Sequence, residues 1–95
     1  MEEIGWATIR QLPDGESVPG HIQARQDQTL FVLLPPGAQA SFEDGSALEV
    51  QSDRLLYLGV VVGWRESVML VSVEHAADRA ILAEVQNVWQ GSSEN

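Results

Sequence analysis

The chain has 95 residues, with 14 acidic side chains against five basic ones and a formal net charge of −9 at pH 7. This length is typical of a single domain with one modest core. Such a surface repels phosphate backbones and anionic lipid headgroups, so we expect neither a nucleic-acid polymer nor a membrane as partner. The sequence has no cysteine, which excludes disulfides and thiolate metal sites and favours a cytoplasmic protein.

We expect no targeting segment in this sequence. Residues 1–10 (MEEIGWATIR) are acidic and lack the apolar core of a signal peptide. The longest apolar run has about ten residues, half of what a membrane-spanning helix needs. Residues 91–95 (GSSEN) are polar, and we expect a disordered tail there. Residues 1–90 are therefore predicted to form a single domain.

The first half of the chain predicts a hairpin. Residues 4–10 alternate, but neither face is purely apolar, which favours an edge strand. Residues 13–15 (PDG) predict a turn in which Gly15 supplies a positive φ. The second predicted strand, residues 18–25, contains Pro19 and Gly20 near its start, which indicates an edge position or a bulge.

The side chains of the second predicted strand divide between two faces. Simple alternation places Ile22 and Ala24 on one face and His21, Gln23 and Arg25 on the other. The polar connection that follows, residues 26–28, is short. We therefore expect another antiparallel strand directly after it.

Residues 29–34 (TLFVLL) are apolar on both faces and predict a central strand, which residues 35–37 (PPG) end. Residues 38–45 predict a loop in which Ala40 and Phe42 close the open end of the sheet. The following residues, 47–51, alternate and predict a half-buried strand with Leu48 and Val50 inward.

The longest apolar run, residues 55–64, is predicted to be a bent strand because Gly59 and Gly63 interrupt it. A turn at residues 65–67 leads into a predicted strand over residues 68–73. Long bent strands favour a coiled, barrel-like sheet over a flat one. We expect six to seven antiparallel strands.

A C-terminal helix is predicted to begin near Ala76. One apolar stripe recurs at helical spacing and consists of Ala77, Ile81, Val85, Val88 and Trp89. The predicted helix therefore packs on the sheet. The expected fold class is mostly β with a C-terminal α-helix.

No group of residues announces a catalytic chemistry. No acid lies in an apolar run that would raise its pKa by burial, and no serine lies in a nucleophile-elbow motif. His21 and His75 are the only histidines and lack metal-ligand spacing. We therefore predict no catalytic residue, no metal and no cofactor.

Tryptophan and arginine are the remaining candidates for binding. Trp6, on the first predicted strand, and Trp89, at the end of the predicted helix, are candidate anchors for a protein partner. Trp64 is interpreted as a core residue. The five arginines are scattered, and each is interpreted first as a solvated or paired surface residue.

Two segments resemble the PilZ family, whose members are six-stranded barrel-like sheets with a C-terminal helix. Residues 54–86 (RLLYLGVVVGWRESVMLVSVEHAADRAILAEVQ) look like the last two family strands and the closing helix. Residues 20–35 (GHIQARQDQTLFVLLP) look like the strand, loop and strand that carry part of the family's ligand site. The likeness covers about residues 10–90 and implies a PilZ-like split barrel in a bacterial signalling protein.

The resemblance also implies where a ligand would bind. PilZ domains commonly bind cyclic di-GMP through an RxxxR motif and a [D/N]xSxxG motif. Neither is intact, because Arg10 and Arg25 have no arginine four residues away and residues 23–28 read QARQDQ. Gln23, Arg25 and Gln28 replace the acid, the serine and the glycine, and the lost glycine removes a close backbone approach.

The favoured interpretation is a degenerate PilZ-like regulatory module that acts by protein–protein interaction. One alternative is a cyclic di-GMP receptor with an atypical arginine set, in which Arg10, Gln23, Arg25 and Gln28 are the candidate ligand residues. Another is an unrelated small β-barrel interaction domain, SH3-like or OB-like. A small enzyme would need a deep pocket lined by an acid of perturbed pKa.

We expect a monomer or weak homodimer, with pairing through exposed strand edges or through Trp89.

Overall fold

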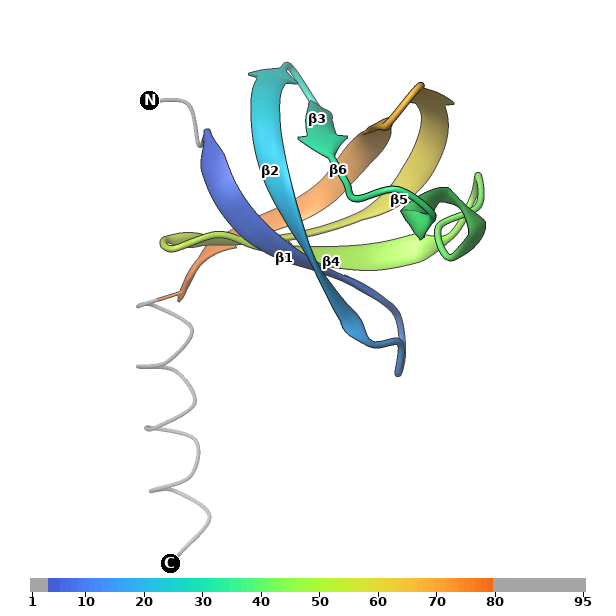
Figure 1. The fold of residues 1–95 in the computed structure, drawn as a ribbon. Coiled ribbons are helices and arrows are strands. Elements are labelled where there is room, and N and C mark those ends of the chain that lie inside the picture. The colour runs from blue at the N-terminus through green and yellow to red at the C-terminus, as the bar shows by residue number, and fades with distance from the viewer. Residues whose placement is uncertain (1–3, 80–95) are drawn as a thin grey trace, which may run out of the picture.

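The computed structural model describes residues 4–79, which form a closed barrel of antiparallel strands. The elements are β1 (Gly5–Gln11), β2 (Ser17–Gln26), β3 (Thr29–Leu33), the 3₁₀ helix η1 (Ala38–Ala40), β4 (Ala47–Gln51), β5 (Leu55–Arg65) and β6 (Val68–Asp78). Around the barrel the order is β1-β2-β3-β6-β5-β4, and β1 closes on β4 (Figure 1). The prediction of a mostly-β, antiparallel, barrel-like sheet is confirmed.

The predicted sheet edges are wrong. β1 pairs with β2 on one side and with β4 on the other, where Ile9 lies opposite Val50. β4 in turn pairs with β5. The polar side chains of residues 4–10 lie on the outer surface of the barrel. A strand with one solvent-exposed face shows the same alternation at the edge of a sheet and in its middle, so the pattern does not identify an edge strand.

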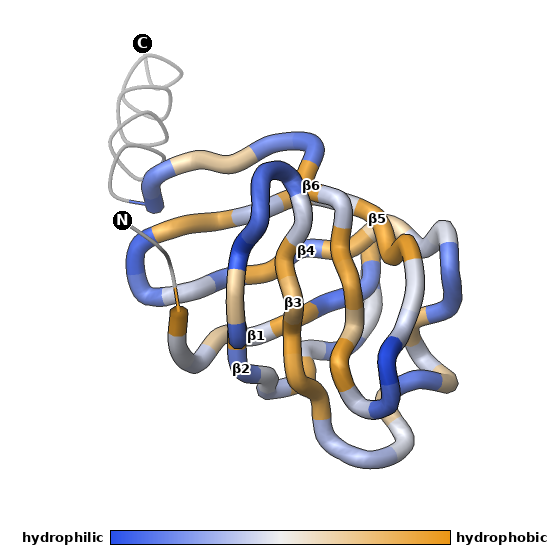
Figure 2. Tube along the Cα trace, turned by 90° about the horizontal axis from the view of Figure 1, so that it is seen from above, coloured by the Kyte–Doolittle hydropathy of each residue, from blue (hydrophilic) through white to orange (hydrophobic). Residues whose placement is uncertain are grey.

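The core fills the inside of the barrel with alternate residues of all six strands. The largest fully buried side chains are Ile9, Ile22, Leu30, Val32, Phe42, Leu48, Val50, Tyr57, Val61, Met69 and Val71. In Figure 2 the tube is hydrophobic along β3 and hydrophilic at the turn that leads from β2 into it. Leu48 and Val50 point inward as predicted.

The interior glycines of β5 mark its bends, as predicted. The pairing of β5 with β6 shifts register between Leu58 and Gly59 and again between Val61 and Gly63. A Cβ on Gly59 would collide with the backbone carbonyl of Ser72 on β6. Gly59 is therefore needed because the two backbones approach closely at the bulge.

The turn between β1 and β2 needs its glycine for space rather than for a positive φ. The Gly15 N–H donates to the Gln11 carbonyl, with 2.8 Å between nitrogen and oxygen. A Cβ on Gly15 would lie 2.7 Å from the same oxygen. The positive φ predicted at Gly15 is wrong, although the hairpin itself forms.

The loop between β3 and β4 contributes Phe42 to the core of the barrel, where its side chain is 1% exposed. The Trp64 Nε1–H donates to the Phe42 carbonyl at 2.9 Å, and Trp64 packs against the core. The anchoring role predicted for Phe42 is confirmed. Ala40 is exposed, so the same prediction is wrong for that residue.

The predicted start of the C-terminal helix at Ala76 is wrong, because β6 continues to Asp78. Ala76 pairs with Tyr57, and Ala77 pairs with Leu56 on the long strand β5. Pairing with an available neighbour strand overrides the local helix propensity of the alanines. The rest of the predicted helix, including Trp89, and residues 91–95 lie outside the described residues.

Candidate functional site

A hollow forms on the outer surface where β2 and β3 separate. The last paired residues of these strands are His21 and Leu33, after which residues 35–37 turn the chain away. Beyond that pair, residues 17–20 of β2 have only β1 as a paired neighbour. Pro19, which lacks an N–H, is tolerated there because no β3 strand lies opposite it.

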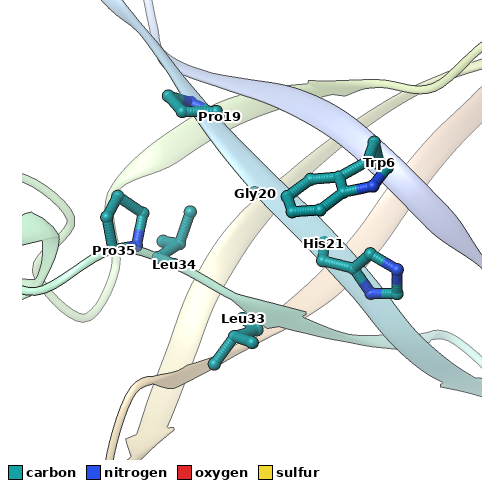
Figure 3. Close-up of a pocket in the computed structure, with 7 residues that line it drawn as sticks. All are labelled: Trp6, Pro19, Gly20, His21, Leu33, Leu34 and Pro35. Atoms are coloured by element: carbon teal, nitrogen blue, oxygen red, sulfur yellow. The ribbon is translucent and has the colours of Figure 1, made fainter.

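The walls of this hollow are almost entirely apolar. It has a volume of about 250 Å³ and is lined by Trp6, Pro19, Gly20, His21, Leu33, Leu34 and Pro35. We call it the apolar hollow. In Figure 3, Trp6 and His21 stand on one side and Leu33, Leu34 and Pro35 on the other, with Gly20 between them. His21 is its only titratable lining residue.

Trp6 is the most exposed large hydrophobic side chain in residues 4–79, with 75% of its surface accessible. The His21 ring lies edge to face with the indole, at a centroid distance of 5.0 Å and an interplanar angle of 88°. Gln23 Nε2 is 2.9 Å from His21 Nδ1, which fixes the imidazole from its other side. The indole is therefore oriented by neighbours without being covered by them.

Trp6 also lines two hollows beside the turn between β4 and β5. The larger, of about 470 Å³, includes Thr8, Gln51, Ser52, Asp53 and Arg79 among its walls. The smaller, of about 60 Å³, is lined by Ile4, Gly5, Trp6, Ser52 and Asp53. We call the smaller one the Asp53 hollow. Trp6 thus separates an apolar recess from a polar one.

The juxtaposition around Trp6 follows from strand register. Counting back from the Arg10–Ser17 pair at the turn places Trp6 opposite His21 and Thr8 opposite Pro19. The sequence identified Trp6 as a candidate but missed Pro19, Leu33, Pro35 and Asp53 as its neighbours. The position of the hairpin turn could have indicated Pro19 and His21, whereas Asp53 required the closure of β1 onto β4.

Arg10, a candidate ligand residue, is occupied by structural contacts. Its Nη2 lies 3.2 Å from Glu49 Oε2 across the β1–β4 pair, and its Nη1 donates to the Pro13 carbonyl at 2.8 Å. Gln51 Nε2 donates to the other Glu49 oxygen at 2.7 Å. These contacts tie β1 to β4 on the outer surface.

Arg25 lies on the opposite face from the one predicted. A β-bulge between Ile22 and Ala24 reverses the alternation, so Arg25 pairs with the buried Leu30 and points inward. Its guanidinium carbon is 5.5 Å from the centre of the buried Tyr57 ring, within cation–π range. Its Nε donates to the Asp27 carbonyl at 3.3 Å.

The four candidate ligand residues do not form one site. Arg10 lies at the hairpin end of β1 opposite Ser17, whereas Arg25 lies near the far end of β2. At about 3.3 Å per residue, roughly 25 Å of strand separates them. Gln23 is held by His21, and Gln28 is exposed at the β2–β3 turn, where its carbonyl accepts from the Val73 N–H at 2.7 Å.

Residues 4–79 contain no group of three or more histidine, cysteine or acidic side chains that could hold a metal ion. They also contain no helix of the length and hydrophobicity that crossing a membrane requires. The Trp6 surface, which consists of the apolar hollow and the Asp53 hollow, joins the most exposed large hydrophobic side chain of residues 4–79 to both recesses, and it is the candidate site.

Comparisons of the chain with protein-family models, with curated proteins and with solved structures found no match.

Proposed function

We propose that this protein is a non-catalytic module that binds a protein segment through the apolar hollow beside Trp6. The observation that carries the proposal is the exposure of Trp6, 75%, at the wall of a recess whose other side is Leu33, Leu34 and Pro35. Exposed tryptophan beside an apolar recess is typical of interaction sites, because burying its ring releases much ordered water.

The preferred occupant is a basic protein segment that carries one large apolar side chain. The hollow, of about 250 Å³, lies just below the usual range of small-molecule pockets and can accept one large apolar side chain. The chain has a net charge of −9, which attracts basic segments and raises their association rate. His21 is the only titratable side chain that lines the apolar hollow, which supports binding over catalysis.

The proposal includes the PilZ relationship as its regulatory context. The observed topology, a closed antiparallel barrel of six strands, supports the barrel-like fold that the resemblance implies. The separation of Arg10 and Arg25, and the engagement of both, favour a degenerate member over a cyclic di-GMP receptor. Titration of the chain with cyclic di-GMP separates these two interpretations, and we expect no saturable binding.

Selection from a random-peptide display library tests this function. We expect peptides enriched on the wild-type chain to share a large apolar residue flanked by lysine or arginine. Their affinity for the Trp6→Ala variant should fall at least about tenfold, the loss typical of a central aromatic anchor.

The matched control is Val62→Ala, because Val62 is 52% exposed on β5 and lines none of the three hollows. This variant should bind the selected peptides like the wild type. Equal binding to the wild type and the Trp6→Ala variant, or enrichment of acidic peptides, would refute the proposal.

A further inference from the structure

We infer that the Asp53 hollow binds a lysine or arginine side chain of the partner, next to the apolar side chain held on the other side of Trp6. This inference rests on the proposed function and names the chemistry of the partner. It assigns a recognition role to Asp53, at the turn between β4 and β5.

Asp53 offers an unused negative charge beside an exposed indole. Its side chain is exposed and makes no hydrogen bond or ion pair within residues 4–79. It shares the walls of the Asp53 hollow with Trp6. A cation placed there gains an ion pair with the carboxylate and a cation–π contact with the ring, a combination that neutral ligands cannot make.

Arg79 does not cancel the negative charge that Asp53 gives to this recess. It lines the larger hollow but not the Asp53 hollow. Its Nη1 donates to the Ser52 carbonyl at 2.8 Å, and its backbone N–H donates to the Arg54 carbonyl at 2.8 Å. No salt bridge joins it to Asp53 among the described residues. Its guanidinium is thus directed at backbone, and the carboxylate remains available.

The size of the recess fits a cationic head group. A volume of about 60 Å³ is enough for a group of a few heavy atoms. Because Trp6 lines both this recess and the apolar hollow, one extended segment can place neighbouring side chains in both. The partner segment therefore carries lysine or arginine within a residue or two of its apolar anchor.

Two tripeptides test the inference: N-acetyl-Arg-Leu-Arg-amide, and the same peptide with both arginines replaced by citrulline. Citrulline keeps the shape of arginine but carries no charge. Amide chemical shifts of the full chain would give the affinity of each peptide at 150 mM salt. We expect the arginine peptide to bind about three- to tenfold more tightly, in the range of a partly exposed ion pair with a cation–π contact.

Asp53→Asn and Asp44→Asn are the matched variants, since both remove one exposed carboxylate and Asp44 lines none of these hollows. The arginine preference should disappear in Asp53→Asn and persist in Asp44→Asn. Equal affinity of the two peptides for the wild type would overturn the inference. An equal loss of the arginine preference in Asp53→Asn and Asp44→Asn would also overturn it, because that result indicates a general effect of net charge.

The two proposals fail in different ways. If the citrulline peptide leaves Leu33 and Leu34 unshifted while the arginine peptide binds in an Asp53-dependent manner, the apolar anchoring is refuted and the cation site is supported. If only the apolar contact is seen, with no dependence on charge, the apolar anchoring beside Trp6 is supported and the cation site is refuted. If neither peptide binds, both proposals fail.

Discussion

At the scale of single residues, the bulge between Ile22 and Ala24 decides the role of Arg25. Without it, Arg25 would face solvent beside Gln23 and be free to meet a ligand. With it, Arg25 points inward and its guanidinium carbon lies over the Tyr57 ring, 5.5 Å from the ring centre. Arg25 thus covers a fully buried aromatic residue, which is a stabilising role.

Replacing Arg25 by alanine should lower the free energy of unfolding by about 1 kcal/mol, the contribution of a partly desolvated cation–π contact. The control is Arg65→Ala, because Arg65 is exposed at the β5–β6 turn. Urea unfolding measures both. Equal stability of the two variants would show that the contact with Tyr57 contributes nothing.

At the scale of elements, β5 carries the bends that allow the sheet to close. Its two register shifts lie at the two interior glycines, but only one of these glycines is tightly packed. Gly59 lies against the backbone of Ser72, whereas an added Cβ at Gly63 would have no atom within 4 Å. The two positions therefore separate the effect of close packing from that of glycine itself.

Gly59→Ala should destabilise the barrel by about 2 kcal/mol or more, because overpacking against backbone forces β5 and β6 apart. Gly63→Ala should change stability by less than about 1 kcal/mol, since alanine also restricts the unfolded chain. Thermal unfolding of the two variants is the measurement. A Gly63→Ala variant as unstable as Gly59→Ala would contradict this account of the bulges.

Strand positions were predictable because side-chain alternation is local and because turn residues such as the PDG of residues 13–15 mark the ends. The inward face of Arg25 and the extension of β6 to Asp78 were not, because they depend on pairing with β3 and β5. Trp6 was recognisable as a candidate, but its neighbours Leu33 and Asp53 are set by pairing and closure.

At the scale of the whole molecule, closure of the barrel pairs β1 with β2 on one side and, over residues 8–11, with β4 on the other. Short strand segments such as residues 17–20 of β2 still lack a paired neighbour on one side. Exposed side chains are the other surface that a partner can use. Among the described residues the exposed large hydrophobic side chains are Ile4, Trp6, Leu33 and Val62. The first three line the hollows around Trp6, and Val62 alone lies elsewhere. The exposed apolar surface is thus concentrated at one place.

The most direct test of the central claim, that the Trp6 surface is the binding site, is a chemical-shift map of the full chain titrated with the tightest peptide from the library. We predict the largest changes at the Trp6 indole N–H and at the amides of Gly20, His21 and Leu33, with Val62 unchanged. Changes centred on Val62, with the Trp6 signals unmoved, would contradict the account.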